Sequence, residues 1–164
     1  MKKFVLSILY FLLTTTVLLG QSKKNDISPQ DLPKEVKNVL NQYIEILEQA
    51  NNLDECAEMF AKIAGGSLVS EDGQSLGNDV KPYSLKKDFQ NIKFYHTTSI
   101  KITRVNVKNS NGMGFGYSAI RGKVYKIWIG KKQGVSGMPA PISIMIPEGH
   151  SEIKTPKVVG IGSL

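Results

Sequence analysis

The hydrophobic pattern of this 164-residue chain changes its period near Lys93. Before that point, apolar residues recur at intervals of three and four, which is the spacing of an amphipathic helix. Beyond it, apolar and polar residues alternate over short runs rich in β-branched side chains, which is typical of strands with one buried face. Helices followed by a run of antiparallel strands predict an α+β fold, with the N-terminal helices packed on an antiparallel sheet.

Two helices are predicted in the first half of the chain. The first covers residues 36–50, where seven apolar side chains follow the helical spacing. Asn52, with Glu55 three residues later, is a capping signal for a second helix over residues 53–64. Three shorter features are expected after it, namely a strand at 67–69, a turn at 71–73 and a short helix that Ser84 caps, from 84 to 92.

The first predicted strand, residues 100–107, contains a phase slip. Ile100 and Ile102 lie on one face of an extended chain, whereas Val105 and Val107 lie on the other. A β-bulge at Thr103 and Arg104 would reconcile the two pairs. The Asn-rich residues 109–112 predict a turn, which leads into a strand at 113–119. Residues 121–123 mark a second turn or a kink. Further strands are expected at 124–129, 140–146 and 157–161.

The first twenty residues predict a secretory signal peptide. Lys2 and Lys3 precede an uncharged apolar run over residues 4–19, and the small residue Gly20 offers a cleavage site. Gln21 follows, where lipoprotein processing needs a cysteine, so we expect export to the periplasm or the medium without a lipid anchor. An uncleaved membrane anchor is the alternative, although the apolar run is short for about 30 Å of hydrocarbon.

The expected organisation is therefore a signal peptide at 1–20, a disordered spacer at 21–27 and a single α+β domain at 28–164. Cys56 is the only cysteine, which precludes an intramolecular disulfide. Its position in the apolar stripe of the second helix predicts a buried small side chain rather than a reactive thiol.

Charge is divided unevenly along the chain. Residues 21–80 carry 5 lysines and 11 acidic residues, whereas residues 81–164 carry 14 basic and 3 acidic residues. Such asymmetry has two explanations. The two halves pack with complementary fields, or the basic half faces an anionic partner.

The order of elements resembles one known superfamily. The stretch from Glu48 to Phe60 is similar to its junction between the first two helices, and a short strand, a small helix and a curved sheet follow. This layout resembles the cone-shaped, cystatin-like superfamily of nuclear transport factor two, the SnoaL-like cyclases and the steroid isomerases. The resemblance implies a cavity at the wide end of the cone, used for catalysis, for ligand binding or for neither, so the fold alone assigns no function.

Three residues are candidates for acid–base catalysis, which needs an ionisable group in an apolar cavity. The resemblance implies that the phenol of Tyr43 would stabilise an oxyanion and that Asp72 lies near the place of a catalytic carboxylate. His96, at the start of the first long strand, is the third. Their plainer interpretations are a core tyrosine, a turn residue and a surface histidine. Glu71, Asp88 and Arg104 are further ionisable residues that such a cavity could hold.

Arg104, Tyr117 and Trp128 are candidates for ligand binding. Turned inward by the bulge, Arg104 would suit a ligand carboxylate or phosphate; turned outward, it is one more charge on a solvated strand face. Basic strands with Tyr117, Tyr125 and Trp128 also suit single-stranded nucleic acid, but export argues against that partner.

Cofactor and metal chemistry find no support in the sequence. The two histidines and single cysteine have no metal-ligand spacing, and neither a phosphate-binding loop nor a nucleophile elbow is present. The glycines between residues 112 and 116 lie in a predicted strand with no helix after it, so we read them as room for sheet curvature.

Three functions remain open on this evidence. The first is an exported, non-catalytic domain that binds a small anionic or amphipathic ligand, or a protein partner, through a cavity or the basic sheet face. The second is an acid–base enzyme of the steroid-isomerase or SnoaL type. The third is a structural homodimer that pairs sheet to sheet around Trp128.

Overall fold

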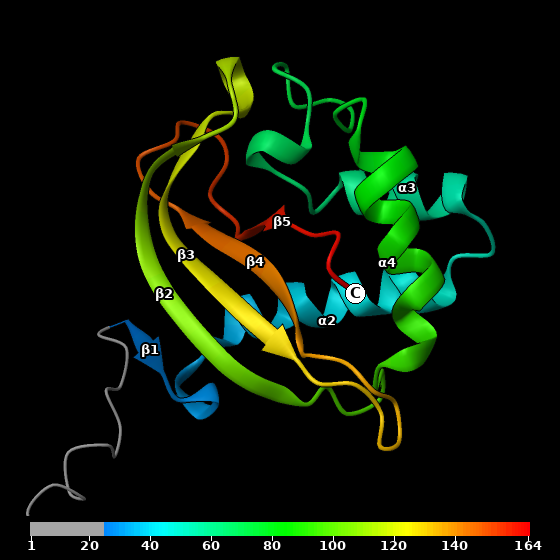
Figure 1. Ribbon diagram of the computed structural model, residues 1–164. Helices are drawn as coiled ribbons and strands as arrows, with labels where there is room; N and C mark the ends of the chain where they lie inside the picture. The colour runs from blue at the N-terminus through cyan, green and yellow to red at the C-terminus, as the bar shows by residue number, and fades with distance from the viewer. Residues whose placement is uncertain (1–24) are drawn as a thin grey trace, which may run out of the picture.

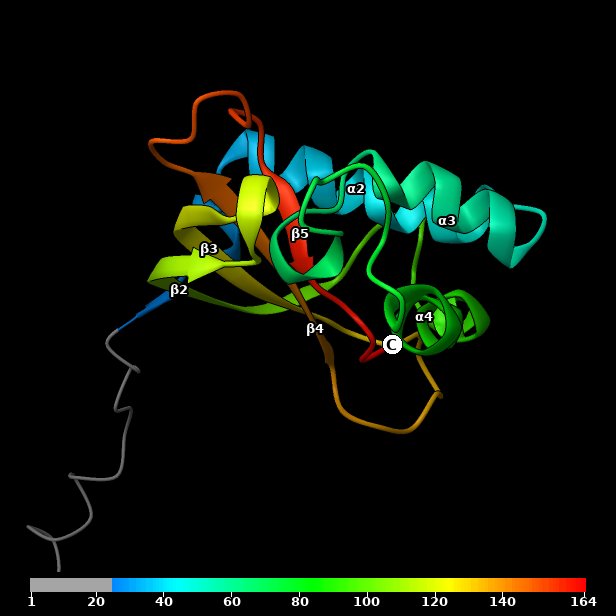
Figure 2. The same ribbon diagram turned by 90° about the horizontal axis from the view of Figure 1, so that it is seen from above.

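In the computed structural model, which describes residues 25–164, helices pack across one face of a five-stranded antiparallel sheet (Figure 1, Figure 2). The α+β class predicted from the change of period is confirmed. The sheet is open, and its strands follow the order of the chain. The predicted signal peptide lies outside the described residues.

The strands are β1 (Asp26–Ile27), β2 (Ile102–Met113), β3 (Ile120–Ile129), β4 (Ala140–Pro147) and β5 (Lys157–Gly160). The α-helices of the described part are α2 (Lys34–Gln49), α3 (Leu53–Ala61) and α4 (Lys86–Asn91). Short turns of 3-10 or π-helix connect them, and α2 lies across the sheet while α4 closes one end near the C-terminus (Figure 1, Figure 2).

The core lies between α2 and the inner face of the sheet. Seven side chains of α2 are buried, six of them in the predicted apolar stripe. They form one hydrophobic cluster with alternate residues of the central strands, Tyr125, Ile127 and Ile129 on β3 and Ile142 and Ile144 on β4. Because only one face of each strand enters this cluster, the alternation seen in the sequence is preserved.

The predicted bulge in β2 is confirmed. The register between β2 and β3 shifts between Ile102, opposite Ile129, and Arg104, opposite Trp128. The extra residue, Thr103, places Ile102 on the core side and Arg104 on the outer side of the sheet. The junction of α2 and α3 is also as predicted, because the side chain of Asn52 accepts a hydrogen bond from the N–H of Glu55 at 3.0 Å.

The turn predicted at 109–112 is wrong. Strand β2 continues to Met113, with a second register shift after Ser110, and the chain reverses only at residues 114–119. Gly114 and Gly116 have φ values of +90° and +56°, which residues with a Cβ rarely adopt, so they make the reversal. The strand expected at 113–119 is therefore absent, and β3 begins at Ile120 instead of 124.

Two shorter predictions in the helical half also differ from the structure. Residues 66–68 form a 3-10 turn instead of a strand, and Val69 makes only an isolated bridge to Leu76. The third helix begins earlier than predicted, as a π-helical turn over Val80–Leu85, so Ser84 lies within it and does not cap it.

The predicted disordered spacer, residues 21–27, contains strand β1 at its end. Asp26 pairs with Asn106 and Ile27 with Val105 along the edge of β2. Two side-chain contacts account for the order. Ile27 packs against the core, and the carboxylate of Asp26 forms a two-point ion pair with Arg104.

Candidate functional site

The core contains a buried polar pair, Tyr43 and Asp88, both 0% exposed. The Tyr43 hydroxyl donates to Asp88 Oδ2 at 2.7 Å. The backbone N–H groups of Gly162 and Leu164 donate to the two carboxylate oxygens, each at 2.8 Å. Asp88 therefore attaches the C-terminal segment, residues 162–164, to α4 and α2.

Burial shifts the pKa of both members of this pair upward. It raises the pKa of Asp88, while the hydrogen bonds from Gly162, Tyr43 and Leu164 act in the opposite direction. Burial and the adjacent carboxylate raise the pKa of Tyr43 well above its usual value. The hydrogen-bond donors that the structure places on Asp88 all belong to the chain itself, and the side chains of Tyr43 and Asp88 do not reach the surface. This arrangement is therefore suited to stabilising the fold.

The other two candidate catalytic residues lie on the surface, apart from the buried Tyr43. Asp72 is exposed in the turn predicted at 71–73, where it accepts hydrogen bonds from Ser70 Oγ at 2.5 Å and from the N–H of Gln74 at 3.0 Å. These bonds lower the pKa of Asp72. His96 is exposed in the segment before β2. The exposed Glu71 belongs to the same turn as Asp72.

Arg104 and Trp128, two of the candidate binding residues, lie together on the outer face of the sheet. The guanidinium carbon of Arg104 is 4.6 Å from the Trp128 ring centroid, and the ammonium of Lys126 is 5.2 Å from it. Arg104 also donates to Asp26 Oδ2 and Oδ1 at 3.0 and 3.2 Å. The guanidinium is thus already engaged by a carboxylate and a ring, which ties β1 to the sheet.

Tyr117, the third candidate, belongs to a different cluster. Its hydroxyl donates to Glu152 at 2.7 Å, which raises the pKa of Tyr117, and its ring meets His150 edge-on at 5.4 Å between centroids. His150 Nδ1 accepts the N–H groups of Glu152 and Ile153 at 3.1 and 2.9 Å, and Nε2 lies 2.9 Å from the Tyr117 carbonyl. These contacts fasten the loop before β5 to the reversal between β2 and β3.

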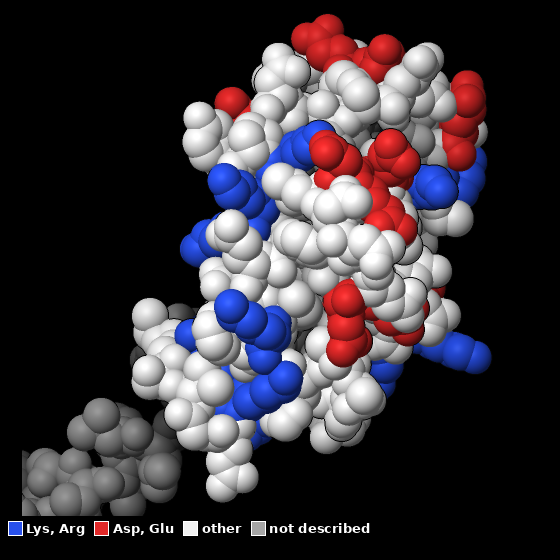
Figure 3. Space-filling view, turned by 90° about the vertical axis from the view of Figure 1, so that its right-hand side faces the viewer, with Lys and Arg blue, Asp and Glu red and all other residues white. Residues whose placement is uncertain are grey.

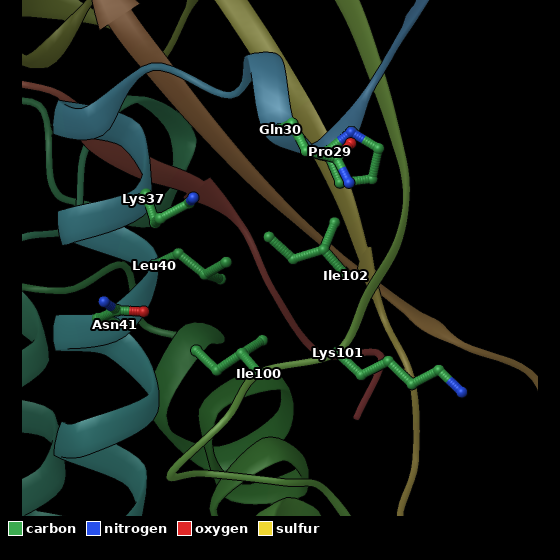
Figure 4. Close-up of a pocket in the computed structure, with 8 residues that line it drawn as sticks. All are labelled: Pro29, Gln30, Lys37, Leu40, Asn41, Ile100, Lys101 and Ile102. Carbon is green, nitrogen blue, oxygen red and sulfur yellow. The ribbon is translucent and has the colours of Figure 1, made fainter.

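The sequence did not predict a groove that opens between α2 and the start of β2. Its volume is about 430 Å³. Eight residues line it, namely Pro29, Gln30, Lys37, Leu40, Asn41, Ile100, Lys101 and Ile102 (Figure 4). The spacing of Lys37, Leu40 and Asn41 marks one side of a helix, but nothing local in the sequence indicates that residues 100–102 would face it.

The groove combines an apolar floor with a cationic rim. Leu40, Ile100 and Ile102 converge on its floor, and the side chain of Lys37 extends from α2 toward it (Figure 4). The side chain of Lys101 points away from the other lining residues (Figure 4). None of the eight lining residues is acidic, so the groove suits a molecule with an alkyl part and a negatively charged end.

Within residues 25–164, no group of three or more His, Cys, Asp or Glu side chains is placed to hold a metal ion. No helix in that same range combines the length and apolar character needed to cross a membrane. The chain matches no protein-family model, no curated protein and no solved structure. The resemblance to the cystatin-like superfamily accordingly extends to the general kind of fold, helices on an antiparallel sheet.

Proposed function

We propose that this protein is an exported, non-catalytic binding domain that holds a small amphipathic anion in the groove between α2 and β2. The observation that carries the proposal is a lining that combines the apolar Leu40, Ile100 and Ile102 with the lysine Lys37 and contains no acidic residue. A volume of about 430 Å³ lies in the usual range for small-molecule sites. Each buried methylene of an alkyl chain would contribute about 0.8 kcal/mol.

Acid–base catalysis is less well supported by the same residues. Proton transfer needs an ionisable group within hydrogen-bond reach of a bound molecule, commonly with a second group to return the proton. The groove offers Lys37, but the side chain of Lys101 leaves it (Figure 4). The buried Tyr43 and Asp88 pair binds the chain's own backbone.

A sheet-to-sheet homodimer is also less well supported. A two-fold interface centred on Trp128 would bring Arg104 and Lys126 of one copy toward the same residues of the other. Like charges brought together in this way oppose association.

Calorimetric titration with dodecyl phosphate, and with dodecanol as its uncharged counterpart, tests the proposal. Dodecyl phosphate should bind the more tightly, and Lys37→Gln should weaken its binding at least about tenfold, because a hydrogen bond to a charged group contributes about 1.5–3 kcal/mol. Lys34→Gln is the matched control, since Lys34 is an exposed lysine one turn earlier on α2 that does not line the groove. It should change the affinity less than twofold.

The floor is tested separately with Ile100→Asn, a substitution at a half-buried position before β2. It should weaken both ligands, because it removes the apolar surface that both alkyl chains contact. Equal binding of the two ligands, or equal losses in Lys37→Gln and Lys34→Gln, would show that the groove does not select an anion.

A further inference from the structure

Two loops meet at one end of the sheet and bring four lysines together. The N–H of Lys132 donates to the carbonyl of Phe94 at 2.9 Å, and Tyr95 forms a β-bridge with Lys131. The N–H of Gly130 donates to the carbonyl of Lys101 at 2.8 Å. We call this surface the lysine apex and define it by Lys93, Phe94, Lys101, Lys131, Lys132 and Met138.

The charge of the lysine apex is largely uncompensated. The 59 residues from 89 to 147 contain 9 Lys or Arg residues and no Asp or Glu. Within residues 25–164, none of the four apex lysines forms a salt bridge. The ammonium groups of Lys131 and Lys132 donate instead to the carbonyls of Ser136 and Lys93, at 3.0 and 2.9 Å.

The segment that joins Lys93 and Lys101 contacts one carboxylate among the hydrogen bonds of the described residues. Glu48 on α2 accepts a hydrogen bond from Thr97 at 2.6 Å. Elsewhere on this side of the molecule, acidic side chains gather along the top and the right of centre, and most basic side chains lie toward the left and lower left (Figure 3).

Exposed apolar side chains lie among these lysines. Met138 is 86% exposed, and Phe94 is 38% exposed with the Lys93 ammonium 5.3 Å from its ring centroid. Met138 belongs to the loop between β3 and β4, which projects beyond the ends of both strands at the bottom of Figure 1. Apolar side chains placed among cations suit a partner that is both apolar and anionic.

We propose that the lysine apex docks reversibly on an anionic phospholipid bilayer. Lysine ammonium groups are compact, hydrated charges that suit a diffuse layer of phosphates, whereas pairing with protein carboxylates favours the forked guanidinium of arginine. Met138 and Phe94 reach the boundary between headgroups and acyl chains, and the lysine stems lie along it. The proposal concerns a surface separate from the floor of the α2–β2 groove, and it does not depend on ligand binding there.

Each lysine near an anionic bilayer strengthens binding about fivefold, since its contribution is about 1 kcal/mol. Cosedimentation with vesicles should therefore show binding when about one third of the lipid is phosphatidylglycerol and much weaker binding to pure phosphatidylcholine. Raising the salt from about 0.1 M to about 0.5 M should release the protein, because it shortens the screening length.

A double substitution, Lys93→Gln with Lys132→Gln, should weaken vesicle binding about 25-fold, at about fivefold per lysine. Its control, Lys34→Gln with Lys62→Gln, removes the same charge from exposed positions on the helical layer and should change binding less than twofold. Met138→Asp should weaken binding at least fivefold without loss of stability, because the side chain is 86% exposed.

Several outcomes would overturn the proposal. They are an absence of binding to phosphatidylglycerol vesicles, equal binding to both kinds of vesicle, or equal losses in the two double variants. Two results together would point to an acidic polymer as the partner in place of a bilayer. They are full displacement of the protein from vesicles by a soluble polyanion, and vesicle binding by Met138→Asp that equals binding by the parent.

Discussion

Replacing Tyr43 with Phe tests whether the buried carboxylate of Asp88 stabilises the fold. The substitution removes one oxygen and keeps the ring, which is fully buried and packs 5.2 Å from the ring of Phe60 between centroids. Asp88 loses the donor at 2.7 Å and keeps the two backbone donors at 2.8 Å. The change therefore isolates one hydrogen bond in the core.

Removal of a donor from a buried acceptor with charged character costs about 1.5–3 kcal/mol. We therefore expect Tyr43→Phe to lower the free energy of unfolding by about 2 kcal/mol. For a urea m-value of about 2 kcal/mol/M, the unfolding midpoint falls by about 1 M. In a double-mutant cycle with Asp88→Asn, the two substitutions should be non-additive by at least about 0.5 kcal/mol, because they share one contact.

The cost should also depend on pH. The hydroxyl of Tyr43 lowers the pKa of Asp88, because it stabilises the charged carboxylate against the burial that raises this pKa. This stabilisation is present above the raised pKa of the folded state and is lost as the pH falls through it. The difference between parent and Tyr43→Phe should hence be larger at neutral pH than near pH 3.8, the ordinary pKa of the carboxyl group.

The free energy of unfolding is measured by urea titration. Unfolding is followed by far-ultraviolet circular dichroism and by the fluorescence of Trp128, the single tryptophan. Coincident transitions would support two-state unfolding, on which the free energies depend. A loss below about 0.5 kcal/mol together with additive double-mutant behaviour would refute the assignment of a stabilising role to this contact.

Three further outcomes follow from local contacts. Asn52→Ala should cost about 1 kcal/mol in urea unfolding, because it removes the N-cap of α3. Burial raises the pKa of the Cys56 thiol from 9.0 to about 11. Its reaction with a disulfide reagent at pH 8 should therefore be about 100-fold slower than the reaction of the unfolded chain. Equal rates would contradict the burial of this thiol. His150→Ala should speed tryptic cleavage after Lys154, seen by mass spectrometry, since His150 fastens that loop.

Local signals in the sequence predicted the parts of the fold that local physics determines. The stripe of α2, the cap at Asn52 and the bulge before Arg104 each depend on side chains within a few residues of one another. In each case the spacing of apolar or capping residues has one good structural solution.

Features formed by distant residues escaped prediction. Strand β1 looked like part of a spacer because its support comes from Arg104, 78 residues away. Asp88 was only one of several ionisable residues that a cavity could hold, and nothing local indicated its partners, since its donors lie at Tyr43 and beyond residue 160. The Asn-rich stretch at 109–112 satisfied local turn rules, yet the pairing of β2 with β3 extended through it and moved the reversal to glycines two residues later.

The groove and the lysine apex are neighbours through one residue, Lys101. Lys101 is one of the residues that line the groove, but its side chain points out of it (Figure 4). That side chain passes close to Gly130, at the base of the β3–β4 loop. The N–H of Gly130 donates a hydrogen bond to the carbonyl of Lys101. A bilayer bound at the lysine apex would therefore lie beside the groove. An amphipathic anion could then exchange between groove and membrane over a short path, with lysines along it to compensate its charge. If both proposals hold, this adjacency would give the basic half of the chain a role that neither complementary packing nor a free anionic ligand provides by itself.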